Sequence, residues 1–237
     1  MPSTMLSTPN EPIKVVVVDV HYLIRHAIRD MFASQETIEL VGEGAVGEDI
    51  LPLVEQHEPD VLLLDLAMPQ NYLDTDEKFL ALPMIAKLRR RWPPMAIIIL
   101  SAYLKPNIIH GAIKLGVPGY LLKSDDLSRE LPTAVVSVYQ GSKAFSRTVL
   151  DKLVQEPELT QIPSLTARQI EVLAVMAKMP DAPYLELAGQ LNITVSTLKK
   201  HLTKAYQTLG VRNNKAAIMR CIELGIIPDN DEDGEGA

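Results

Sequence analysis

An uninterrupted apolar run, residues 61–64, leads directly into the carboxylate of Asp65. A short run of this kind fits a strand that is buried on both faces of a parallel sheet. Asp65 would then lie at the carboxyl edge of the sheet, where ligands bind in open α/β folds. A carboxylate at this edge can accept a phosphoryl group as an acyl phosphate. An aspartate that only caps the following turn would give the same pattern.

Three other apolar runs also end in a polar side chain: Ile13–Val18 in Asp19, residues 96–100 in Ser101, and Gly119–Leu122 in Lys123. Stretches with helical spacing of apolar residues follow the strands, for example over residues 23–32, 85–92 and 108–115. Strands that alternate with helices predict βαβ units and a parallel sheet with right-handed crossovers. We therefore predict an α/β fold in which the four strand ends meet at one edge.

These strand ends resemble the receiver domain of bacterial response regulators, a (βα)5 flavodoxin-like fold with a parallel sheet. The resemblance includes the family's Met-Pro pair after the phosphoacceptor, here Met68-Pro69. It implies these roles: Asp65 as phosphoacceptor, Asp19 and Asp65 as Mg²⁺ ligands, Ser101 and Lys123 as phosphate-pocket residues, and Tyr120 as the aromatic switch.

Two features depart from the receiver pattern. The family has a second acidic residue after the first, and here that position is Val20, which cannot ligate a cation, so Mg²⁺ affinity should be weakened. His21 follows, but histidine is common there in one subfamily and does not by itself indicate metal binding. The segment 70–81 is longer than the family's loop and lacks glycine. It is either a solvated acidic loop or the source of a replacement ligand, with Asp74, Asp76 and Glu77 as candidates.

The C-terminal part predicts four short helices, over residues 170–178, 184–191, 195–209 and 214–224. A capping-box pattern, Thr166 with Gln169, precedes the first of them. The second and third are joined by a short turn and the third is rich in lysine, which fits a helix-turn-helix. A basic helix can also be no more than a solvated face.

Charge is distributed unevenly along the chain. The net charge of −7 alone would argue against nucleic acid, but residues 160–225 carry more Lys and Arg than Asp and Glu. The single cysteine, Cys221, excludes an intrachain disulfide and suits a reducing cytoplasm. No apolar run is long enough for a membrane span, so we expect no membrane partner.

Four segments of the C-terminal part, residues 165–173, 186–193, 197–202 and 209–214, resemble the LuxR-type DNA-binding domain. The resemblance implies binding of double-stranded DNA as a homodimer. It places Lys199, Lys200 and Thr203 toward the DNA groove, and Thr197, Lys204 and Arg212 toward the DNA backbone.

A receiver followed by a LuxR-type domain is the arrangement of NarL/FixJ-class response regulators. This implies a cytoplasmic transcription factor that a histidine kinase phosphorylates on Asp65. The expected organisation is a receiver at 11–141, a linker at 142–163, a helix-turn-helix domain at 164–226 and a disordered acidic tail at 227–237.

Two other functions compete with this interpretation. Val20 favours a regulator that works without phosphate, whose receiver serves as a dimerisation or ligand-sensing module. A phosphatase of the haloacid dehalogenase type needs a second Asp two residues after the first, and that position is His21, so we do not expect an enzyme.

Overall fold

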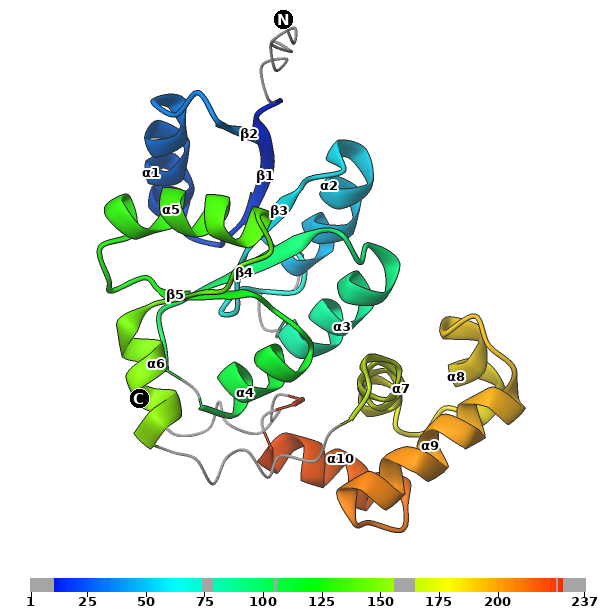
Figure 1. The fold of residues 1–237 in the computed structure, drawn as a ribbon. Coiled ribbons are helices and arrows are strands. Elements are labelled where there is room, and N and C mark those ends of the chain that lie inside the picture. The colour runs from blue at the N-terminus through cyan, green and yellow to red at the C-terminus, as the bar shows by residue number, and fades with distance from the viewer. Residues whose placement is uncertain (1–10, 74–78, 105, 156–164, 225, 228–237) are drawn as a thin grey trace, which may run out of the picture. The chain divides into compact units, whose positions relative to one another are not determined.

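The computed structural model describes residues 11–73, 79–104, 106–155, 165–224 and 226–227 (Figure 1). The strands are β1 (Ile13–Val18), β2 (Ile38–Gly44), β3 (Val61–Asp65), β4 (Ala96–Ser101), β5 (Gly119–Leu122) and β6 (Ala144–Phe145). The N-terminal helices are α1 (Tyr22–Ala33), the 3₁₀ turn η1 (Gly47–Asp49), α2 (Ile50–His57), α3 (Ala81–Arg91), α4 (Pro106–Lys114), α5 (Leu127–Tyr139) and α6 (Arg147–Gln155). The C-terminal helices are α7 (Ala167–Lys178), α8 (Tyr184–Gln190), α9 (Val195–Leu209) and α10 (Asn214–Glu223). Within these residues no helix has the length and apolar character that a membrane crossing needs.

The strands form one parallel sheet in the order β2-β1-β3-β4-β5-β6. The chain leaves β1 for β2 on one side and returns to β3 on the other. This reversal is the switch point at which parallel sheets form a ligand crevice. The predicted α/β fold is confirmed, with one short strand beyond the five expected.

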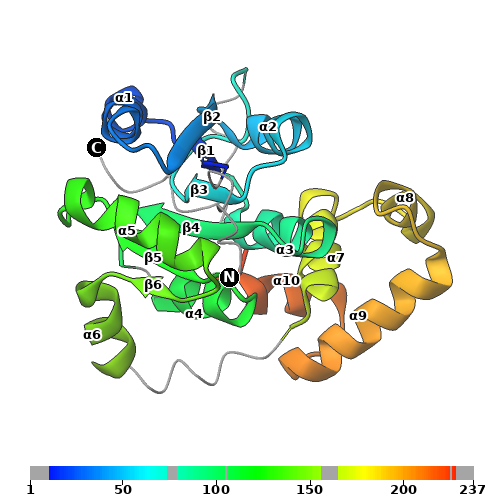
Figure 2. The same cartoon turned by 45° about the horizontal axis from the view of Figure 1, so that its top comes forward.

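The sheet is buried because helices cover it. Helices α1 and α5 lie on one face of the sheet (Figure 2). Alternate strand residues, among them Val15, Val17, Leu63 and Ile98, pack in one core cluster with apolar residues of these two helices. Helix α2 contacts β1 and β2 from the opposite face. Burial on two faces explains why β3 and β4 read as continuous apolar runs instead of alternating patterns.

Five elements have no counterpart among the residue ranges predicted from the sequence: β2, η1, α2, β6 and α6. The last two fall within the segment expected as a linker. Ala144 and Phe145 pair with Gly119 and Tyr120, and Val149 of α6 is fully buried. A two-residue strand carries no periodic signal, so its pairing partner, not its own sequence, defines it. The candidate ligands of the acidic loop and the acidic tail from residue 228 lie outside the described residues.

The four predicted C-terminal helices are confirmed as α7 to α10. Thr166 and Gln169 form the predicted capping box at α7, each side chain accepting a hydrogen bond from the other's backbone N–H. Thr194 caps α9 by accepting from the Thr197 N–H at 3.1 Å. Gly210 ends α9 at φ 70°, a left-handed conformation that glycine adopts without a Cβ penalty. Local side-chain chemistry therefore defines both ends of α9.

Candidate functional site

The carboxyl edge of the sheet brings together Asp19, Asp65 and Lys123. Val18 pairs with Leu64 across β1 and β3, so the aspartate that follows each of them lies beside the other. Both aspartates are fully buried. The Lys123 Nζ lies 2.7 Å from Asp19 Oδ2 and 2.8 Å from Asp65 Oδ2. The structure therefore brings together three residues that the sequence analysis assigned to one pocket.

Backbone groups fix the orientation of both carboxylates. The His21 backbone N–H donates to Asp19 Oδ1 at 2.9 Å, and the Ala67 N–H donates to Asp65 Oδ1 at 3.1 Å. Each Oδ2 then faces Lys123. Among the described residues, neither Oδ2 has a partner in hydrogen-bonding geometry, although the ammonium lies at ion-pairing distance from both. One ammonium thus compensates two buried carboxylates, and the pocket retains an unbalanced negative charge.

Ser101 and Tyr120 form the next part of the pocket. Ser101 ends β4 and is buried, and its carbonyl accepts the Lys123 backbone N–H at 2.8 Å. Tyr120 is fully buried and shares a side-chain hydrogen bond with Ser101. Burial raises the pKa of Tyr120 to about 12, with the negative charge of Asp65 adding to the effect. The phenol therefore stays protonated near neutral pH, and Ser101 connects it to the pocket.

Helix α9 carries most of the predicted DNA-contacting residues. One of the six predicted residues, Thr197, is half-buried. The other five are exposed: Lys199, Lys200, Thr203, Lys204 and Arg212. All but Arg212, which follows α9, line a shallow groove along this helix. Partial burial of His201, which also lines the groove, lowers its pKa, so the positive charge of this face comes from the lysines.

Some of these groups already have partners within the domain. The Lys199 Nζ lies 5.9 Å from the centroid of the Tyr184 ring, within range of a cation–π contact. The Thr203 hydroxyl donates to the Lys199 carbonyl at 2.9 Å. The Thr197 Oγ1 lies 2.9 Å from Thr194 Oγ1 at the start of the helix. Lys200 and Lys204 are thus the exposed cations of α9 for which the structure gives no such contact among the described residues.

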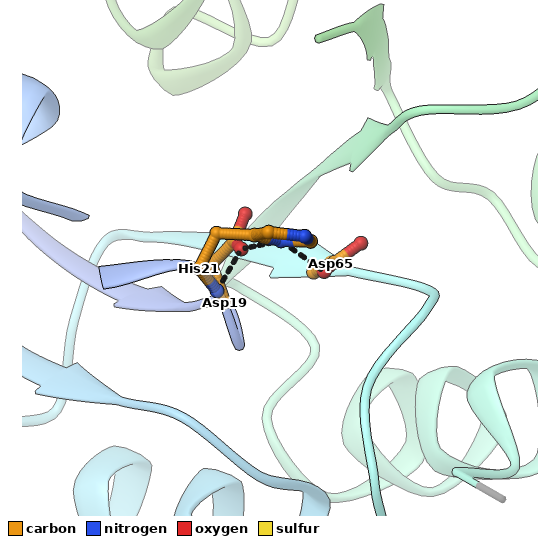
Figure 3. A group of neighbouring side chains, drawn as sticks. All are labelled: Asp19, His21 and Asp65. Atoms are coloured by element: carbon orange, nitrogen blue, oxygen red, sulfur yellow. Dashed lines mark hydrogen bonds and ion pairs between the residues drawn. The ribbon is translucent and has the colours of Figure 1, made fainter. Parts of the chain in front are cut away.

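Three residues offer ligand atoms for a metal ion: Asp19, His21 and Asp65 (Figure 3). Their donor atoms all lie within 4.8 Å of one another. The two carboxylates fit a divalent cation, but Val20 contributes no oxygen to complete the family's acidic set. His21 was not predicted as a metal ligand. The sequence feature that could have indicated this role is its position two residues after Asp19, where the turn brings its ring next to the Asp19 carboxylate.

Val20→Asp is expected to tighten Mg²⁺ binding by about 10–100-fold, the usual scale for changes in the surroundings of a bound metal. The substitution adds an oxygen ligand next to Asp19. Calorimetric titration without any phosphodonor measures the change. Val20→Asn is the matched control, because it adds polarity without charge. If the wild type already binds Mg²⁺ as tightly as Val20→Asp, another group replaces the missing carboxylate.

Comparisons with known proteins agree with this geometry. The response regulator receiver domain model matches residues 15–135, and the model of bacterial regulatory proteins of the luxR family matches residues 163–221. The chain is 29% identical over 219 residues to the response regulator protein VraR of Staphylococcus epidermidis, covering 91% of this chain and 99% of that protein. VraR of Staphylococcus aureus is 27% identical over the same length.

Solved structures of response regulators are similar to this chain in fold. The RcsB response regulator of Salmonella typhimurium, studied for its DNA interaction, has a TM-score of 0.54 and 25% identity, covering 88% of this chain and 97% of that one. An RcsB–DNA complex has a TM-score of 0.54 and 24% identity, covering 89% and 98%. The chain therefore belongs to the response regulators that join a receiver domain to a LuxR-type DNA-binding domain.

Proposed function

We propose that this protein is a cytoplasmic transcription factor whose DNA binding is controlled by phosphorylation of Asp65. The observation that carries the proposal is the fully buried Asp65 carboxylate at the sheet edge, 2.8 Å from the Lys123 ammonium. A histidine kinase supplies the phosphoryl group. One Asp65 oxygen forms a bond to phosphorus as the bond from phosphorus to the kinase histidine nitrogen breaks, giving an acyl phosphate.

The pocket residues act on the phosphoryl group in different ways. Lys123 neutralises a phosphoryl oxygen as a compact point charge. Asp19 and Asp65 are the ligands for a divalent cation, which when bound supplies positive charge to the phosphoryl oxygens. The Ser101 hydroxyl turns to a phosphoryl oxygen and gives up its hydrogen bond with Tyr120. Tyr120 then changes position, which shifts a pre-existing equilibrium between two states.

In the proposed active state the protein binds double-stranded DNA as a homodimer, with two α9 helices in successive major grooves. Relatives support this step, since solved structures include an RcsB–DNA complex and two RcsB dimers bound to two parallel DNAs. Residues 11–141 would form the receiver, and 164–226 the DNA-binding domain. The base-contacting positions would be Lys199, Lys200 and Thr203, and the phosphate-contacting positions Thr197, Lys204 and Arg212.

Lys204→Ala is expected to weaken binding to all duplexes alike and to lower the salt slope by about one, because one phosphate contact is lost. Lys200→Ala should weaken the binding free energy for a DNA site selected by the wild-type protein by about 1–3 kcal/mol. It should also relax specificity at one base pair of that site. Fluorescence anisotropy across a salt series measures both effects. Lys143→Ala, which removes an exposed charge outside the LuxR-type match, is the control. Unchanged affinity and slope in both α9 variants would mean that these lysines only solvate the helix.

The proposal as a whole is tested by incubating the full chain with a small phosphodonor and Mg²⁺. Intact mass reports phosphorylation, sedimentation reports dimer formation, and anisotropy reports DNA affinity. We expect all three to change together. Mass gain without any change in sedimentation or affinity would contradict the proposed control of DNA binding.

A second candidate function is a regulator that needs no phosphate. Val20 favours it, because the chain lacks one of the family's acidic residues and Lys123 already pairs with both remaining carboxylates. Such a protein would show no mass gain with the phosphodonor. It would nevertheless sediment as a dimer and bind DNA without treatment.

A further inference from the structure

The His21 side chain lies next to the carboxylates of Asp19 and Asp65 (Figure 3). Its Nδ1 is 3.1 Å from Asp19 Oδ1 and 3.9 Å from Asp65 Oδ2, and its side chain is 58% exposed. The residue precedes α1, and its own backbone N–H is bonded to Asp19. The same short turn therefore holds the carboxylate in place and brings an imidazole nitrogen next to it.

The spacing of these donors suits a single bound ion. Metal–nitrogen and metal–oxygen bonds of about 2.0–2.2 Å place opposite ligands about 4 Å apart and neighbouring ligands closer. The three donor atoms lie within 4.8 Å of one another, so small side-chain adjustments suffice. The ring is already held at this position, with its Nδ1 3.1 Å from Asp19 Oδ1 and 3.5 Å from the Lys123 Nζ, so a bound ion would take over contacts that the imidazole makes within the pocket.

The pocket also contains more negative than positive charge. Asp19 and Asp65 are fully buried, and within the part of the chain that the structure describes the Oδ2 of each has an ion-pair contact with Lys123 but no partner in hydrogen-bonding geometry. Both Oδ2 atoms are aimed at one point, which the Lys123 ammonium occupies. Two carboxylates and the one Lys123 ammonium leave a single negative charge, which a divalent cation at the same edge would more than offset.

We propose that this pocket is a mixed nitrogen–oxygen site for a divalent transition metal, such as Co²⁺, Ni²⁺ or Zn²⁺, with His21 as a ligand. The imidazole takes the place of the carboxylate that Val20 cannot supply. Imidazole suits these metals, whereas Mg²⁺ requires oxygen ligands and retains its waters. The inference rests on the proposed function for Asp19 and Asp65 as ligands, and it adds the class of metal and one ligand.

The test is a metal titration of the untagged full chain without any phosphodonor. Co²⁺ is followed by its visible absorption, which reports the ligand set, and Mg²⁺ by calorimetry. His21→Ala should weaken Co²⁺ binding by at least about tenfold, since losing even a partner of a ligand has an effect of 10–100-fold. Mg²⁺ binding should be unchanged, and the Co²⁺ spectrum should lose its nitrogen contribution. Because His21 is largely exposed, this variant should fold normally.

Two further variants sharpen the test. His26→Ala removes another half-exposed histidine, which pairs with Asp30 on α1, and should leave both affinities unchanged. His21→Asp should raise Mg²⁺ affinity and lower the ratio of Co²⁺ to Mg²⁺ affinity, because it restores an all-oxygen site. Raised Mg²⁺ affinity with an unchanged ratio would count against the selectivity that we propose.

The inference is overturned if His21→Ala weakens Co²⁺ and Mg²⁺ equally, or neither, or if the Co²⁺ spectrum is unchanged. These outcomes differ from a failure of the proposed function. Phosphorylation of Asp65 in Mg²⁺ with no effect of His21 on metal selectivity would leave the function intact and reject the inference. If metal selectivity depends on His21 but the chain never gains phosphate, the inference stands and the proposed function is rejected.

Discussion

Asp65→Asn is expected to abolish all phosphodonor-dependent mass gain. An amide nitrogen or oxygen cannot form the acyl phosphate, so the loss should be complete. Asparagine has the same shape as aspartate, and its side-chain oxygen can still accept the Ala67 N–H that holds the native carboxylate. The variant should therefore fold, and circular dichroism and sedimentation of the unphosphorylated chain should match the wild type. Intact mass after treatment measures the result.

Asp30→Asn is the matched control for this experiment. Its carboxylate is 68% exposed on α1, and its replacement should leave the mass gain unchanged. A phosphorylated peptide mapping to any residue other than Asp65 would contradict the prediction. Residual mass gain in Asp65→Asn with wild-type kinetics would do so as well.

Lys123→Met is expected to destabilise the receiver by about 3–5 kcal/mol, the usual cost of removing one partner from a buried ion pair. The side chain is only 9% exposed, and its removal leaves Asp19 and Asp65 facing each other without a counter-charge. Methionine keeps nearly the same length and apolar surface, so the loss reports the charge. Urea unfolding followed by the fluorescence of Trp92, the only tryptophan and within the receiver match, measures it.

The unfolding experiment should be run with a chelator, and then with added Co²⁺. The metal should recover part of the lost stability, because anything that binds only the folded state stabilises it. Lys143→Met, at an exposed position, should unfold like the wild type. A Lys123→Met protein as stable as wild type in chelator would mean that the buried carboxylates do not need Lys123.

The sequence predicted the strands of the sheet well where apolar runs were long and ended in polar residues. β1 and β5 match their expected ranges, because all of their residues except Lys14 are buried and leave a recognisable apolar pattern. β2 has mixed polarity, IELVGEG, and its edge position gives it no clear pattern. β6 is defined by two pairs with β5 that nothing in its own sequence announces.

The residues of the candidate site were likewise predictable only in part. Asp19, Asp65 and Lys123 were predicted together, because strand ends in a parallel sheet share one edge. Two contacts were not predictable: the hydrogen bond between Ser101 and Tyr120, and the approach of His21 to both carboxylates. Both contacts depend on side-chain rotamers within turns and strands. A sequence pattern indicates which residues share an edge of the sheet, but not which rotamers their side chains adopt.

The backbone N–H groups of residues 21 and 67 hold the carboxylates of Asp19 and Asp65. The position of each carboxylate therefore does not depend on which side chain these two residues carry. Any residue except proline provides the N–H that fixes Asp19, so the side chain at position 21 can vary while the carboxylate stays in place. In the metal site that we propose, a single codon change at position 21 would alter which ion the pocket prefers while Asp65 keeps its position. On this proposal, the ion preference of the receiver can change in evolution independently of its proposed phosphoacceptor.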